Sequence, residues 1–134
     1  MPIGVLNCNP GNIRSSSELY QGEIDSRFGY KKFKSMPYGY RAMFRILRTY
    51  KRNHCLDTLE QMIYRWAPPS DNNKTEVYVN FVAKRSGIDR DCVVDTENRN
   101  VMCRIVDAMA EMECGGDTGW HPDMNEIVDG WKLL

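Results

Sequence analysis

The chain has 134 residues, of which 42% are hydrophobic, and this length supports one hydrophobic core rather than two. Its 18 Lys and Arg residues balance its 18 Asp and Glu residues, so no overall basic field favours nucleic acid or an anionic membrane as a partner. We therefore expect a single domain over residues 1–134 that binds no nucleic acid, and any partner must be recognised by local motifs.

The start of the sequence carries no signal for secretion. MPIGVLNCNPGNI lacks a basic segment followed by an apolar run, and no later segment approaches the roughly 20 apolar residues of a membrane span. We therefore expect a protein that is made in the cytoplasm and does not insert into a membrane. The five cysteines form no Cys-x-x-Cys pair and the two histidines lack the spacing of metal ligands, so we expect free thiols, no metal site and no cofactor.

The first 35 residues are predicted to be rich in loops. They contain the turn-forming sequence NPGN and the run SSS, and no helical period is sustained beyond one turn. The alternation in YKKF, from Tyr30 to Phe33, is typical of a short strand and is consistent with a small β-hairpin.

Two amphipathic helices follow this part. From Pro37 to about Arg52, apolar residues recur at helical spacing while basic residues occupy another face. Thr58 and Gln61 have the spacing of a capping box at the start of a second helix that runs to Trp66. The two prolines that come next are expected to end it.

A third helix is expected to begin at a cap formed by Asn72, Asn73 or Thr75, and to end near Ser86. A fourth is expected over about residues 96–114, and a fifth begins with a proline at position 122. Trp131 lies on the apolar stripe of the fifth helix and is expected to be buried as its anchor. These elements predict a mainly α domain.

Three carboxylates, Glu18, Glu23 and Asp25, lie in the part without a helical period. Glu23 follows Tyr20 and Gly22 in YQGE. A carboxyl group held against an aromatic ring, beside a glycine that gives a ligand access, is in the environment that keeps a glutamic acid protonated. An ordinary solvated glutamate in a loop is the alternative.

The segment IYRWAPPSDNN raises a second possibility, that of a carbohydrate site. Arg65 and Trp66 are at the end of one helix, and the amides of Asn72 and Asn73 come just before the next. Aromatic faces with guanidinium and amide groups suit sugars, which present apolar C–H faces and many hydroxyls. We expect the segment from Pro68 to Asn73 to be an ordered corner facing the same cleft as Glu23, and a purely structural helix corner is the alternative.

Several motifs in the same order resemble a phage-derived family of proteins commonly labelled virion structural proteins, which occur in phages, prophages and Bacteroides-type genomes. The motifs are NPGNIR, YQGEI, FKSMPYGYRAMFRILRTY, TLEQMIYRWAPPSDNN and TEVYVNFVAKRSG. Members of this group resemble the lysozyme-like superfamily of muramidases and lytic transglycosylases. The resemblance implies a lysozyme-like helical domain with a small β element near an active-site cleft.

The resemblance also implies the chemistry, with Glu23 of YQGE as the general acid. Protonated Glu23 would donate to the glycosidic oxygen between N-acetylmuramic acid and N-acetylglucosamine in peptidoglycan. Water would then complete hydrolysis, or the 6-hydroxyl of muramic acid would give the anhydro product of a transglycosylase, and the sequence leaves both open. Asp25 or Asp71 would be a helper, although the motif requires no second carboxylate.

The residues that the resemblance implies as substrate-binding are Asn12, Arg14, Tyr40, Arg65, Asn72, Asn73 and Tyr78. Each has a structural alternative: a turn for Asn12, a surface ion pair for Arg14, a core contact for Tyr40. The expected partners are peptidoglycan glycan strands, with phage virion or secretion-system components to deliver the protein to the cell wall. The alternative is a non-catalytic virion structural or glycan-binding protein with the same fold.

Overall fold

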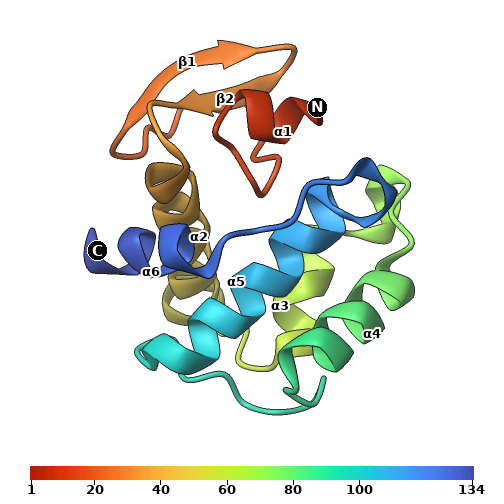
Figure 1. The fold of residues 1–134 in the computed structure, drawn as a ribbon. Coiled ribbons are helices and arrows are strands. Elements are labelled where there is room, and N and C mark those ends of the chain that lie inside the picture. Colours follow the sequence, from red (N-terminus) through yellow and green to blue (C-terminus); the bar gives the residue numbers. More distant parts are fainter.

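A computed structural model describes all residues, 1–134, as six α-helices and one antiparallel hairpin (Figure 1). The helices are α1 (Ile3–Leu6), α2 (Met36–His54), α3 (Leu59–Trp66), α4 (Thr75–Ser86), α5 (Arg99–Cys114) and α6 (Met124–Lys132). The strands are β1 (Glu23–Arg27) and β2 (Tyr30–Phe33), and two 3₁₀ turns, η1 (Pro69–Asp71) and η2 (Gly116–Thr118), complete the order. The mainly α fold with a small hairpin is therefore confirmed.

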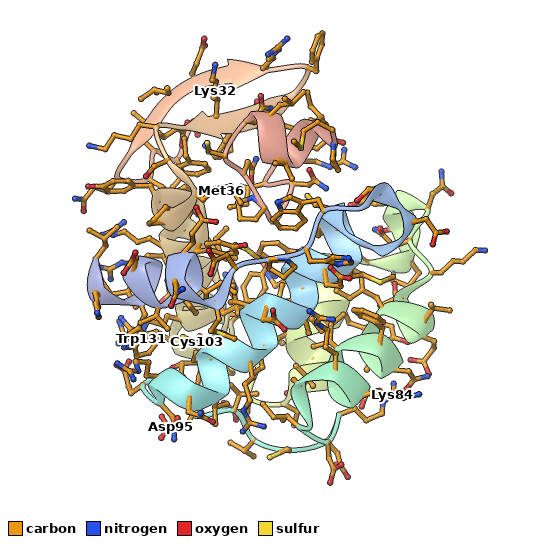
Figure 2. All side chains as sticks on the ribbon, viewed as in Figure 1. Lys32, Met36, Lys84, Asp95, Cys103 and Trp131 are labelled. Atoms are coloured by element: carbon orange, nitrogen blue, oxygen red, sulfur yellow. The ribbon has the colours of Figure 1, made fainter.

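One hydrophobic core of 24 buried residues lies between the long helices. In Figure 1, α5 runs diagonally through the middle, with α2 and α6 on one side and α4 on the other. In Figure 2, Cys103 of α5 lies toward the centre and is buried, whereas Lys84 extends from α4 into solvent. None of the helices combines the length and apolar composition that crossing a membrane requires.

The first residues of α3 and α4 can be compared with the capping residues that the sequence predicts. The capping box of α3 is confirmed, because Thr58 Oγ1 accepts from the backbone N–H of Gln61 at 3.2 Å and Gln61 Oε1 accepts from the N–H of Thr58 at 3.1 Å. The predicted caps of α4 are wrong, because Lys74 holds the cap position and makes no capping bond with its side chain. The hydroxyl of Thr75 instead donates to the carbonyl of Ala67 at 2.6 Å and so ties α4 to the end of α3.

Two later helices start slightly beyond their predicted positions. α5 begins after Asn98, whose side chain accepts from the N–H of Val101 at 3.0 Å. α6 begins after Asp123, which caps it, so the proline at position 122 precedes the cap instead of occupying the first helical position. In both cases a polar side chain that satisfies a free N–H group fixes the start.

Trp131 of α6 is partly exposed, so the expectation of full burial is wrong (Figure 2). Its ring meets the ring of Phe44 edge to face, with 5.2 Å between the centroids. The guanidinium of Arg48 lies 4.9 Å from the centroid of the indole. The indole therefore attaches α6 to α2 at the border of the core, where the cation covers part of its surface.

The first helix, α1, was not expected from the sequence, because a single turn is too short to show a period. It packs against the end of α5, where Gly4 makes close contacts. A Cβ atom on Gly4 would lie 2.6 Å from both Asn12 Oδ1 and Cys114 Sγ. The thiol of Cys114 also donates to the carbonyl of Pro10 at 3.5 Å, so the N-terminal segment is held against α5.

Candidate functional site

A groove lies between the loop after α1 and the end of α3, and encloses about 390 Å³, a size typical of ligand sites. The residues that line it are Gly11, Asn12, Ile13, Arg14, Tyr30, Tyr50, Arg65, Trp66, Ala67, Pro68, Asp71, Asn73 and Glu113. A second hollow, lined by Tyr50, Leu56, Gln61, Tyr64, Arg65 and Pro68, shares three of these residues. The two hollows are therefore adjacent parts of one groove.

The loop that forms one wall is shaped by the buried side chain of Asn9. Its Nδ2 donates to the carbonyls of Ile13 and Lys31, both at 2.9 Å, and its Oδ1 accepts from the N–H of Ile13 at 2.9 Å. These bonds fold the sequence NPGNI around one amide group and tie it to β2. The loop thereby brings Asn12 and Arg14 to the groove.

Gly11 allows the same loop to approach the opposite wall of the groove at Trp66. A Cβ atom at this position would lie 2.9 Å from Cζ2 of Trp66 and 3.0 Å from Sδ of Met43. Such contacts are too close for any side chain, so only glycine allows the backbone to approach the indole in this way. The two walls therefore meet directly at Trp66.

Glu113, in the last turn of α5, lies where the walls meet. Asn12 Nδ2 donates to Oε1 of Glu113 at 3.1 Å and, at 3.3 Å, to its backbone carbonyl. Trp66 Nε1 and the hydroxyl of Tyr78 donate to the other carboxyl oxygen, Oε2, at 3.2 and 2.8 Å. No Lys, Arg or His side chain forms an ion pair with Glu113.

The three side chains that donate to the Glu113 carboxyl group are all neutral. The amide of Asn12 and the indole of Trp66 donate through their N–H groups, whereas the hydroxyl of Tyr78 both donates and accepts. The pKa of Tyr78 is raised well above its usual range by burial and by the charge of Glu113, so the phenol stays protonated. A carboxyl group in a groove is a candidate general acid or base, and Glu113 is one of two in this groove.

Glu23 lies outside the groove, and the placement expected for it is wrong. Its two carboxyl oxygens accept from Lys31 Nζ at 2.9 and 3.1 Å, and the Lys31 side chain is only 1% exposed. The same ammonium donates to the backbone carbonyl of Glu18 at 2.7 Å. A buried ammonium group needs a counter-charge, and Glu23 supplies it, so this carboxylate stabilises the hairpin and the loop before it.

The alternatives to Glu23 are not in the groove either. Glu18 lines a separate depression beside Arg41 and Arg45, and Asp25 lies exposed on β1, where it accepts from the N–H of Ser26 at 2.7 Å. Asp71 does line the groove and is its second carboxylate.

Four predicted binding residues, Asn12, Arg14, Arg65 and Asn73, line the groove. The other three do not. Tyr78 is buried behind Glu113 and reaches it through its hydroxyl, and Asn72 is exposed at the left-handed end of η1 with φ 62°. Tyr40 is fully buried in the core, where Gly130 of α6 packs on it, so its expected place in the cleft is wrong.

The corner from Pro68 to Asn73 is ordered by a bond between its two ends. Asn73 Nδ2 donates to the carbonyl of Pro68 at 3.0 Å, and η1 lies between them. Pro68, Asp71 and Asn73 line the groove but Glu23 does not, so the expectation that the corner faces the same cleft as Glu23 is wrong.

The sequence reasoning missed Glu113, Tyr30 and Tyr50. One signal for Glu113 was present in the sequence, because it continues the helical spacing of Met102, Val106 and Met109, which are buried. A carboxylate on an apolar stripe needs partners or a function, and here it has both neutral partners and a place in the groove.

Comparison with known proteins adds one close match. No protein-family model matches the chain. The chain is similar to Protein P5 of Pseudoalteromonas phage PM2, with 38% identity over 96% of this chain and 79% of the phage protein. The similarity extends over nearly the whole fold, and the chemistry of the groove has to be inferred from its own residues.

Proposed function

We propose that this chain, which belongs to the family of Protein P5 of Pseudoalteromonas phage PM2, cleaves the glycan of bacterial peptidoglycan. The bond cut would be the one between N-acetylmuramic acid and N-acetylglucosamine. The observation that carries the proposal is the position of Glu113, a carboxyl group that lines the groove and forms no ion pair.

The walls of the groove support a glycan as the ligand. Tyr30, Tyr50 and Trp66 line the groove, and Tyr64 lines the adjoining hollow. Aromatic rings pack on the apolar C–H faces of sugars, while the amides of Asn12 and Asn73 suit their hydroxyls.

In this proposal Glu113 takes the role of general acid that the resemblance had implied for Glu23. Protonated Glu113 donates to the glycosidic oxygen as positive charge develops on the sugar being released. The carboxylate that remains still accepts from Asn12, Trp66 and Tyr78, so it needs no rearrangement after proton transfer. Asp71 would assist a water molecule, or the 6-hydroxyl of muramic acid would attack and give an anhydro product.

The test is the turbidity loss of purified peptidoglycan with wild-type protein and with Glu113→Gln. Glutamine keeps the size of the side chain but has no proton to transfer, so the rate should fall by about a hundredfold or more. Asp25→Asn, an exposed carboxylate outside the groove, is the matched control and should keep the wild-type rate. Mass spectrometry of the products distinguishes reducing ends from anhydro ends.

Glu23→Gln separates the two assignments of the acid. It should lower the melting temperature, because Lys31 loses its counter-charge, yet retain activity below the melting transition. Loss of activity in a folded Glu23→Gln protein, together with full activity of Glu113→Gln, would return the role to Glu23.

One observation favours a second function, glycan binding without cleavage. Three hydrogen bonds from the protein already engage the Glu113 carboxyl group, as expected for a purely structural carboxylate. Wild-type protein that sediments with peptidoglycan but releases no fragments would support this function. Under either function we propose that the protein acts at the bacterial cell wall, reached through a phage virion or a secretion apparatus.

A further inference from the structure

We propose that Arg14 and Arg65 bind carboxylate groups carried by the glycan, so that the groove selects an anionic glycan over a neutral one. This inference rests on the proposed function in one respect, namely that the ligand of the groove is a glycan. It does not depend on whether Glu113 cleaves that glycan.

Both guanidinium groups are free of protein counter-charges. Arg14 and Arg65 line the groove, and neither has a carboxylate oxygen within 4.0 Å. Of the nine other arginines, four are paired, namely Arg48 and Arg52 with Glu97, Arg85 with Asp107, and Arg90 with Glu60 and Glu76, whereas five, including Arg45, are not. The two guanidinium groups are therefore free to donate to a ligand in the groove, which also contains the carboxylates of Asp71 and Glu113.

The guanidinium of Arg65 is held by a ring and not by an acid. It lies 5.5 Å from the centroid of Tyr50, which lines the groove beside it. Stacking on an aromatic face limits the motion of the guanidinium plane and leaves the N–H groups along its edge free to donate. Arg65 also lines the adjoining hollow, so it lies where the two parts of the groove meet.

The two arginines come from opposite walls that meet at the proposed acid. Arg14 follows Asn12 by two residues, and Arg65 immediately precedes Trp66. Because Asn12 and Trp66 both donate to the Glu113 carboxyl group, each arginine is close in sequence to one of its partners. Both arginines line the same groove as Glu113, and in this proposal a glycan bound there contacts both guanidinium groups.

The ligand chemistry that matches is a carboxylate, because a guanidinium donates two parallel hydrogen bonds to it. A polymer of N-acetylglucosamine has no charged group. N-acetylmuramic acid carries a lactyl group, whose carboxylate is free when no peptide is attached, and an attached peptide brings carboxylates of its own. Both sources offer the same group to the arginines, and neither is present in the neutral polymer.

The test measures dissociation constants with Glu113→Gln, which prevents turnover. The ligands are glycan fragments with peptides, the same fragments after an amidase has removed the peptides, and a chitin oligosaccharide of equal length. At least one anionic ligand should bind about tenfold or more tightly than the neutral one, since hydrogen bonds to charged groups stabilise by roughly 1.5–3 kcal/mol. Which of the two binds more tightly identifies the source of the carboxylate.

Arg14→Gln and Arg65→Gln are then added together to the Glu113→Gln protein. The ratio of the dissociation constants for the neutral and the anionic ligand should fall to about one, with little change in the affinity for the neutral oligosaccharide. Arg45→Gln is the matched control, because Arg45 also lacks a carboxylate partner but lines a separate depression, and it should keep the preference. Melting curves of each protein verify folding.

The role of the arginines would be overturned if the preference for anionic ligands survives in the protein that carries all three substitutions. It would also be overturned if Glu113→Gln alone shows no such preference while the wild type cleaves peptidoglycan. Either result would leave the proposed function standing. Failure of all three ligands to bind would overturn both. Loss of cleavage in Glu113→Gln with unchanged charge preference in the arginine variants would support the function alone.

Discussion

Replacing Asn9 by alanine tests whether one buried amide shapes the wall of the groove. Alanine removes two donated bonds, to the carbonyls of Ile13 and Lys31, and one accepted bond, from the N–H of Ile13. The N–H of Ile13 and the carbonyl of Lys31 would lose this partner in a buried region, whereas the carbonyl of Ile13 would still accept from the N–H of Lys31 at 3.0 Å. At about 1 kcal/mol for each hydrogen bond, the free energy of unfolding should fall by about 3 kcal/mol.

The loss would be large relative to the roughly 5–15 kcal/mol that stabilises an ordinary domain. For a chain of this length it corresponds to a decrease of about 10 °C in the melting temperature. Thermal unfolding followed by circular dichroism, together with denaturant titration, measures it. Below the transition, affinity for glycan should also fall, because the loop no longer fixes Asn12 and Arg14.

Asn98→Ala provides a matched control for this experiment. Asn98 is an exposed cap whose side chain makes one hydrogen bond, to the N–H of Val101. Its removal should cost about 1 kcal/mol and should leave the groove unchanged. Equal losses of stability in the two variants would refute the reasoning, since Asn9 would then contribute no more than an ordinary surface cap.

Two further perturbations test contacts outside the groove. Trp131→Ala should lower the free energy of unfolding by about 2 kcal/mol, because the ring packs on Phe44 and Arg48 at the border of the core. This loss is smaller than the one expected for a fully buried indole. Unchanged denaturant midpoints would contradict the prediction. Hydrogen bonds from Arg90 and then Tyr64 lower the pKa of Glu76 to about 2. Because the folded pKa is below the unfolded one, the stabilisation by Glu76 is present at neutral pH and is lost as the pH falls through about 4 toward 2. Glu76→Gln should therefore flatten the dependence of the melting temperature on pH in this acid range, and an unchanged acid limb would exclude the contribution.

Local patterns predicted the parts of the fold that depend on neighbouring residues. The helical period before Arg52 and the capping box at Thr58 both concern residues within one or two turns, and the structure contains both. The cap of α4 was predicted wrongly because Thr75 has a partner in another element, the carbonyl of Ala67. Such a contact between elements has no signature at short range.

The functional site depends even more than the fold on contacts between residues far apart in the sequence. The partners of Glu113 come from positions 101, 47 and 35 residues away, so no local motif marks it as part of a cleft. For Glu23, the aromatic neighbour inferred from YQGE is real, since Tyr20 lies beside the same cluster. However, its ring faces the ammonium of Lys31, at 5.5 Å from the centroid, and this lysine pairs with the carboxylate. The sequence therefore indicated that Tyr20 lies close to Glu23, but not that the buried ammonium group of Lys31 pairs with the Glu23 carboxylate.

The contact between Asn12 and Glu113 makes the groove sensitive to local unfolding of the N-terminal segment. Detachment of residues 1–14 from α5 would remove one wall of the groove while leaving the helical core intact, so function would be lost in a partial opening well before global unfolding. A ligand that spans both walls would act in the opposite direction and hold the segment closed. Amide hydrogen exchange in this segment, slowed by ligand while exchange within the core is unaffected, would therefore report occupancy of the groove.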